Sequence, residues 1–210
     1  MTRFVDRRAA GQALAEALVA YANRSDVVVV GLPRGGVPVA AEVAHAVRAP
    51  LEILVVRKLG APMQRELALG AIASGGFRVV DDVLVRTLGV SEEELAAVES
   101  AERAELRRRE ARYRAGRAAL SLAERTVILV DDGLATGATM RVAIQAVRAA
   151  KAMRVIVAVP VAPPETMERL RAEADEVVCL QTPVHFIGVG AWYDRFPQLT
   201  DADVLALLAG

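Results

Sequence analysis

The sequence of 210 residues has little cysteine, few aromatic residues and no long apolar run. Its one cysteine, Cys179, excludes an internal disulfide and, because it lies among apolar residues, indicates a buried thiol in a reducing cytosol. No apolar run approaches the ~20 residues of a membrane span, and the N-terminus, MTRFVDRRAAGQ, lacks the apolar core of a signal peptide. We therefore expect a cytoplasmic protein that does not contact a membrane.

An excess of charge of one sign is also missing, because Lys plus Arg and Asp plus Glu both number 26. Without an overall positive field, nucleic acid is not an expected partner. Lysine itself is scarce: only Lys58 and Lys151 occur among the 26 basic residues. Lys58 is therefore a candidate for a role that needs a compact ammonium group on a flexible stem, with a lysine left by chance as the alternative.

Two common nucleotide-binding motifs are absent, since neither GxxxxGK[ST] nor GxGxxG occurs and a lone GVG is too short to count. The most informative stretch reads VILVDDGLATGATM, residues 127–140. Its apolar run over 127–130 predicts a strand buried on both faces of a parallel sheet, and residues 140–150 predict a helix. Asp131 and Asp132 lie between them, at the ligand edge of an open α/β sheet. The acid pair of a receiver domain would instead follow the first strand.

The residue types of this loop suit a phosphorylated ribose. Backbone amides can converge on a phosphate at the helix N-terminus, and two threonines add hydroxyl donors. Asp131 and Asp132 can accept hydrogen bonds from a sugar diol and attract Mg²⁺. A helix cap without a ligand is the structural alternative. The candidate phosphate-binding residues are Gly133, Ala135, Thr136, Gly137, Ala138 and Thr139.

A second candidate loop, Pro33-Arg34-Gly35-Gly36, lies between an apolar strand predicted over 27–30 and a helix predicted over 37–47. The two glycines let backbone amides approach a ligand closely, and Arg34 can place two donors on phosphate oxygens. A tight turn that merely needs glycine is the alternative. The presence of the acid-pair loop favours a binding role.

The segment VDDGLATGAT resembles the loop that binds phosphoribosyl pyrophosphate (PRPP) in the type I phosphoribosyltransferases. LPRGGVPVA, VRKLGAP, ELALGAI, REARYR and VCLQTP are similar to segments of bacterial phosphoribosyltransferases whose acceptor is unassigned. The resemblance implies that residues 135–139 bind the 5-phosphate, and that Asp131 with Asp132 binds the ribose hydroxyls and, with PRPP oxygens, Mg²⁺. Residues 33–36 resemble the family's pyrophosphate loop, which often contains a strained or cis peptide. They would hold the diphosphate together with Lys58.

The implied reaction is a substitution at ribose C1, in which PRPP loses pyrophosphate while a nitrogen of a nucleobase-like acceptor attacks. Charge grows on the departing diphosphate, so the protein contributes positioning and electrostatic stabilisation. Hypoxanthine-type members carry a further Asp where this sequence has Ala135, so a 6-oxopurine acceptor is not expected and the acceptor stays open. The alternative function is a PRPP-binding regulator without turnover, with RNA binding through an arginine-rich helix.

The order of the elements indicates one domain over residues 1–210, with a doubly wound, mostly parallel five-stranded α/β sheet and flanking helices. If the strand order is 2-1-3-4-5, the strands ending at Gly31 and Asp131 are neighbours and the two loops face each other. Further elements are predicted as a helix over 7–23 capped by Asp6, strands over 51–56, 154–159 and 177–180, and a helix over 164–173.

Residues 69–122 are predicted to form an insertion of a hairpin and a long helix. Strand-like runs over 69–73 and 77–81 flank a Ser-Gly-Gly turn, and Ser91 with Glu94 forms a capping box for a helix that runs to about residue 116.

Ahead of this insertion, Arg57 and Lys58 are predicted to leave the strand over 51–56 at the ligand edge, as candidate diphosphate ligands. A loop over 60–66 follows, and the role of Glu66 within it is open.

The long helix has a narrow apolar stripe, which suits either a helix laid across the body or one packed against a second subunit. A homo-oligomer through this helix is therefore one of two open alternatives. Its arginines could bind RNA or DNA, but interleaved glutamates favour a solvated, ion-paired face. The expected i,i+4 pairs are Glu99 with Arg103, Glu105 with Arg109 and Glu110 with Arg114.

The C-terminal segment, residues 181–210, holds Phe186 and the only tryptophan, Trp192. It could form a hood whose aromatic rings stack on a planar base, or a small secondary core under a long loop. A final helix is predicted over 201–208, capped by Thr200 and Asp203.

Overall fold

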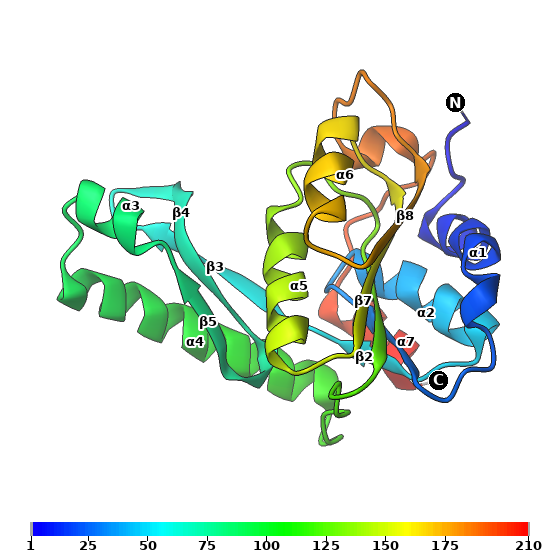
Figure 1. Ribbon diagram of the computed structural model, residues 1–210, viewed down its shortest axis with the longest axis horizontal. Coiled ribbons are helices and arrows are strands. Elements are labelled where there is room, and N and C mark those ends of the chain that lie inside the picture. The colour runs from blue at the N-terminus through cyan, green and yellow to red at the C-terminus, as the bar shows by residue number, and fades with distance from the viewer. Residues whose placement is uncertain (1, 210) are drawn as a thin grey trace.

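The computed structural model describes residues 2–209, without the side chain of Glu66, whose role therefore lies outside the described residues. A five-stranded parallel sheet is at its centre, in the order β2-β1-β6-β7-β8 (Figure 1). This is the predicted order 2-1-3-4-5, and it makes β1 and β6 neighbours. The strands are β1 (Val27–Gly31), β2 (Leu51–Ile53), β6 (Thr126–Val130), β7 (Arg154–Val161) and β8 (Glu176–Gln181).

Helices cover both faces of this sheet, because its central strands are apolar on both sides. Alternate residues of a strand point to opposite faces, so Val29 packs in the core under α1 and α2, whereas Val28 packs in the core under α5 and α6. The predicted doubly wound α/β fold is therefore confirmed. The flanking helices are α1 (Arg7–Ala17), α2 (Gly36–Val47), α5 (Ala138–Ala149) and α6 (Pro164–Arg171).

The first helix is shorter than predicted. The Asp6 side chain accepts from the Ala9 amide and caps α1 as expected, but α1 ends at Ala17 and a 3-10 turn, Val19–Tyr21, follows. The chain turns here because Tyr21 is buried in the α1–α2 core and the Asn23 amide donates to the Val47 carbonyl, both of which bring the chain back toward β1.

The predicted strand over 51–56 and the predicted loop over 60–66 are only partly correct, because the strand is broken after Ile53 and the loop is confined to a turn at residues 62–63. β2 ends at Ile53, and the chain crosses into a second, antiparallel sheet with the strand order β3-β4-β5. Polar residues such as Gln64 and Arg65 read as a loop, yet they are exposed strand residues of an arm that projects from the body (Figure 1). The strands of the arm are β3 (Val56–Ala61), β4 (Gln64–Ala73) and β5 (Phe77–Val80).

The arm is completed by a short helix, α3 (Asp82–Thr87), and by the long helix α4 (Glu92–Arg114). The predicted hairpin is present, as β4 pairs with β5 around Ser74–Gly76, and the Ser91–Glu94 capping box is formed in full. α4 leads from the arm back to the body, where α7 (Asp201–Ala209) contacts it (Figure 1).

Two of the three expected ion pairs along α4 are present, those of Glu99 with Arg103 and of Glu105 with Arg109. Arg114 instead donates to Glu52 of β2 across 3.1 Å. Glu52 is buried and also accepts from the amides of Ile53 and Leu120, so it fastens the returning chain to the sheet.

The cysteine and the lengths of the helices can now be described from the structure. Cys179 on β8 is half-buried, and burial raises the pKa of its thiol to about 11, so that the thiol stays protonated near neutral pH. Within residues 2–209, none of the helices is long and apolar enough to cross a bilayer.

Candidate functional site

The two candidate loops leave the sheet side by side. β1 and β6 pair in parallel with Gly31 opposite Val130, and the Leu32 amide donates to the Val130 carbonyl across 3.0 Å. Both loops therefore begin at the same level of the carboxyl edge of the sheet, as predicted.

Close contact between the loops explains the two glycines. A Cβ atom added to Gly35 would lie 2.1 Å from Oδ2 of Asp132, and one added to Gly36 would lie 2.6 Å from the Val130 carbonyl oxygen. Any larger residue would displace the acid pair. The peptide bond between Pro33 and Arg34 is cis.

The acid pair adopts two different environments. Oδ1 of Asp131 accepts from the Asp132 amide across 2.9 Å, whereas Oδ2 of Asp132 accepts from Nε of Arg7 across 2.7 Å. Burial, and then the charge of Asp132, hold the pKa of Asp131 well above its usual value. Burial also raises the pKa of Asp132, against the opposing effect of Arg7. The ion pair with Arg7 thus distinguishes Asp132 from Asp131, whereas sequence analysis gave both carboxylates the same environment.

Arg7 is the residue of this site that sequence analysis missed. It is buried, its Nη1 donates to the Pro197 carbonyl across 2.8 Å, and its guanidinium lies 3.7 Å from the Phe196 ring centroid. One signal could have marked it: a cation in the first turn of a helix is unfavourable beside the positive end of the helix dipole. Such a residue needs an acidic partner elsewhere in the fold.

The candidate phosphate-binding turn lies at the N-terminus of α5, which Gly137 caps with a left-handed φ of 73°. Thr136 and Thr139 are exposed there. Within the described chain, the amides of Ala135, Thr136, Gly137 and Thr139 donate to no protein acceptor. These free N–H groups, at the positive end of the helix dipole, form an array that suits an anion.

A side chain of α6 holds the turn before α5 in place. Thr166 of α6 donates to the Ala135 carbonyl across 2.6 Å, and its methyl group would lie 2.8 Å from a Cβ atom at Gly137. The position of α6 therefore fixes the shape of the turn.

A cavity of about 430 Å³ lies between Arg7 and Arg34, bordered by Asp132. Two guanidinium groups on its walls make it suitable for an anion. The residues that line it are Arg7, Arg34, Gly35, Asp132, Phe196, Pro197, Gln198 and Leu199.

A larger hollow, of about 1010 Å³, lies away from both loops, among α2, β2, the end of α4 and α7. Its charged residues are largely engaged with one another or with the backbone, since Arg8 pairs with Glu42 and Arg117 donates to the Leu208 carbonyl. We assign the smaller cavity to the site because the candidate loops line it.

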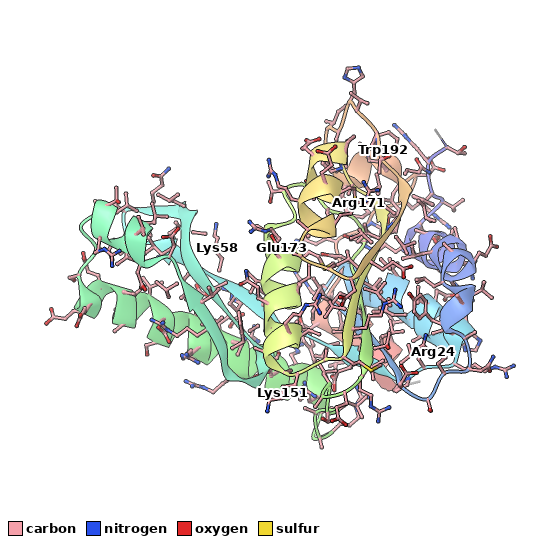
Figure 2. The ribbon with its side chains drawn as sticks, viewed as in Figure 1. Arg24, Lys58, Lys151, Arg171, Glu173 and Trp192 are labelled. Carbon is pink, nitrogen blue, oxygen red and sulfur yellow. The ribbon has the colours of Figure 1, made fainter. Side chains whose placement is uncertain are left out.

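Arg57 and Lys58 are not at the sheet edge where they were predicted. Both lie within β3, where Lys58 pairs with Ala71. Successive strand residues point to opposite faces, and Arg57 donates to Glu102 of α4 across 2.7 Å. Figure 2 shows Lys58 on the side of the arm that faces α5. Both cations therefore belong to the second sheet, and they do not lie at the carboxyl edge of the parallel sheet.

The C-terminal segment covers the acid-pair loop. A Cβ atom at Gly133 would lie 2.7 Å from the Val189 side chain, and the Tyr193 hydroxyl donates to the Asp132 carbonyl. Tyr193 also packs against Phe4 and Phe196, so this part of the segment is a small secondary core.

Phe186 and Trp192, the two residues predicted to stack on a base, are half-buried. Nε1 of Trp192 is buried and has no hydrogen-bond partner among the described residues. Figure 2 labels Trp192 to the right of the upper part of α6.

Asp131 and Asp132 could hold a metal ion only together with ligands from a bound molecule or water. Among residues 2–209, with the Glu66 side chain left aside, no group of three or more His, Cys, Asp or Glu residues could hold a metal ion. Two adjacent carboxylates fit a Mg²⁺ ion that takes its other ligands from substrate oxygens and water, because Mg²⁺ is usually bound by one or two carboxylates plus phosphates.

Comparison with known proteins places this geometry in context. Residues 5–194 match the family model described as a phosphoribosyl transferase domain. The chain is 49% identical over 208 residues to Rv0571c of Mycobacterium tuberculosis, whose name gives it provisionally as a phosphoribosyl transferase. That match covers 99% of this chain and 47% of the relative, so the chain spans about half the length of the curated relatives it matches.

Solved structures resemble the chain along most of its length. The protein TT1426 from Thermus thermophilus is 47% identical with a TM-score of 0.86, and the match covers 99% of this chain and 98% of that one. A hypoxanthine-guanine phosphoribosyltransferase (hpt-2) from Bacillus anthracis has a TM-score of 0.50 at 12% identity, over 88% of this chain and 85% of that one. The second likeness is one of fold.

Proposed function

The chain belongs to the phosphoribosyl transferase family, and from that premise we propose that it is a Mg²⁺-dependent enzyme that transfers the phosphoribosyl group of PRPP to a nitrogenous, nucleobase-like acceptor and releases pyrophosphate. The contact between Gly35 and Asp132 carries this proposal. It brings an arginine-bearing loop against an acid pair that itself leads into an anion-binding turn. A ribose with a phosphate at one end and a diphosphate at the other needs these three features together.

Each part of PRPP has a proposed place. The amides of residues 135–139 and the hydroxyls of Thr136 and Thr139 bind the 5-phosphate, and among these amides that of Ala138 already donates to the Thr136 hydroxyl. Asp131 and Asp132 accept from the ribose hydroxyls and provide the protein ligands of Mg²⁺. Residues 33–36 bind the diphosphate in the cavity beside Arg34.

The protein's contribution to the reaction is orientation and charge. Negative charge grows on the diphosphate as its bond to ribose C1 breaks, and Arg34 offers two donors to it. Mg²⁺, when bound with PRPP, neutralises further diphosphate charge. Lys58 is proposed to approach the diphosphate from β3 of the arm, whereas the neighbouring Arg57 is engaged by Glu102.

The acceptor would lie under the C-terminal segment, where Phe186 and Trp192 are proposed to contact a planar ring. The buried Trp192 Nε1, without a protein acceptor in the described part of the chain, would donate to such a ring. Ala135 provides no carboxylate for a 6-oxopurine, so we propose another nitrogenous base.

The test is pyrophosphate release from PRPP and Mg²⁺ with a panel of nucleobases. We expect at least one base to support release. The double variant Asp131→Asn with Asp132→Asn should lose PRPP binding by calorimetry while keeping the wild-type circular dichroism spectrum. Tight PRPP binding without release for any base would instead identify a regulator, and unchanged affinity in the double variant would refute the site.

A further inference from the structure

One carboxylate stands between Arg34 and the arginine-rich helix. Asp201, the first residue of α7, has Oδ1 3.9 Å from Nη1 of Arg34 and Oδ2 3.2 Å from Nη1 of Arg112. The two arginines come from the diphosphate loop and from α4, far apart in the sequence. They therefore flank a single anionic group.

The carboxylate is fixed more firmly than either arginine. The hydroxyl of the buried Tyr113 donates to Oδ1 of Asp201 across 2.7 Å, and the Asp201 side chain is 17% exposed. The side chains of Arg34 and Arg112 are 40% and 49% exposed. Each arginine can therefore change its rotamer while Asp201 stays bound to Tyr113.

Arg108, one turn earlier on α4, differs from Arg112. Both its Nε and Nη2 donate to Glu105, across 2.7 and 2.9 Å, so its guanidinium is already engaged by a carboxylate of its own helix. Arg112 has no such partner on α4 within the described structure, and its ion pair points to Asp201.

Resting on the function proposed above, we propose that Arg112 is a second diphosphate-binding residue. Asp201 pairs with Arg34 and Arg112 in the absence of the ligand, and the diphosphate replaces Asp201 as the partner of both arginines. Two guanidinium groups that share one carboxylate are close enough to share one diphosphate. The diphosphate carries more negative charge than a carboxylate and offers more acceptor oxygens, so it competes successfully for both. The arginine-rich helix thereby contributes to binding of the leaving group.

The measurement is the affinity for inorganic pyrophosphate in the presence of Mg²⁺, by calorimetry, for four single variants. Arg34→Gln should weaken binding about 10-fold and Arg112→Gln about 5-fold, since charge-assisted hydrogen bonds are strong but these side chains are partly solvated. Arg107→Gln is the matched control, because it removes the same charge from an exposed position on the same helix and should leave the affinity within about 1.5-fold.

Asp201→Asn tests the competition itself. Asparagine keeps a partner for Tyr113 but loses the charge, so pyrophosphate should bind about 3-fold more tightly. Unchanged or weaker binding would overturn the role of Asp201. If Arg34→Gln weakens binding but Arg112→Gln matches Arg107→Gln, the role of Arg112 is refuted while the proposed function stands. If Arg34→Gln has no effect, the proposed diphosphate site itself fails.

Discussion

Arg7 and Asp132 form an ion pair of 2.7 Å that joins the first turn of α1 to the acid pair, across 125 positions of sequence. Both side chains are largely buried, with exposed fractions of 10% and 12%. A buried carboxylate beside a second carboxylate is costly without a cation, because both charges have lost their hydration. Arg7 therefore permits two acids to stand next to each other in the sheet edge.

Replacement of Arg7 by Gln should destabilise the fold by about 2–4 kcal/mol, since it leaves Asp132 buried without its counter-ion. Urea unfolding followed by circular dichroism measures the loss. The neighbouring Arg8→Gln is the control: Arg8 is 75% exposed, so its pair with Glu42 should contribute less than about 1 kcal/mol. In an Asp132→Asn background, Arg7→Gln should lower the free energy of unfolding by less than it does in the wild type. If the effects of the two substitutions on the free energy of unfolding are fully additive, the pairing is contradicted.

Gly35→Ala should remove PRPP binding without unfolding the protein. The new Cβ atom would lie 2.1 Å from Asp132 Oδ2, so the loop or the acid must move and the two halves of the site separate. Calorimetry with PRPP and Mg²⁺ provides the measurement. Gly188→Ala is a suitable control because a Cβ atom there has no neighbour within 4 Å. Wild-type affinity in Gly35→Ala would show that the loops are not in the contact described.

Glu52→Ala should reduce the free energy of unfolding by about 2–3 kcal/mol, because it leaves Arg114 and the amides of Ile53 and Leu120 without their shared acceptor. Equilibrium unfolding in urea reports the change. Glu168→Ala, on the exposed face of α6, should stay within about 0.5 kcal/mol of the wild type. Equal stability of the two variants would argue against a fastening role for Glu52.

The loss of folding stability at acidic pH should depend in part on Asp26. Hydrogen bonds from Arg24 and Thr126 lower the pKa of Asp26 to about 2, below its usual value of 3.8. A lowered pKa in the folded state means that the carboxylate stabilises the fold above pH 3.8 and that this contribution is lost as the pH falls through about 2.

Unfolding midpoints measured between about pH 5 and pH 2 should therefore fall less steeply in Asp26→Asn than in the wild type. Arg24→Gln removes the largest cause of the shift and should flatten the profile in the same direction. Parallel profiles for all three proteins would contradict the assignment.

The parallel sheet, the two loops, the β4–β5 hairpin and the long helix followed directly from the sequence, whereas β3 and the start of β4 did not. Runs such as 27–30 and 127–130 are wholly apolar, which leaves little choice but a strand buried on both faces. Gln64, Arg65 and Ala68 in the first half of β4 are exposed, so this part lacks the apolar alternation that marks a strand, and its pairing with β3 decides its structure. Lys58 was misplaced because the run over 51–56 gives no sign that the chain leaves the parallel sheet after Ile53.

The missing parts of the site depend on contacts between distant segments. No local pattern pairs Arg7 with Asp132 or Asp201 with Arg34, because topology alone brings these residues together. Local signals did succeed where the chemistry is local, as in the Ser91–Glu94 capping box and the cap of α7, in which the Thr200 hydroxyl accepts from the Asp203 amide.

The pairing of β1 with β6 also sets a length scale. Strand residues advance about 3.3 Å each, so a slip of two residues between these strands would part the arginine loop from the acid pair by about 6.6 Å. On the proposed function, the spacing between the two ends of the donor sugar therefore depends on main-chain ladder bonds, whereas the C-terminal segment above the loop pairs with the chain near Phe4 and lies outside the parallel sheet. If the proposed function holds, exchange of the C-terminal segment should change the acceptor preference and leave the affinity for PRPP unchanged.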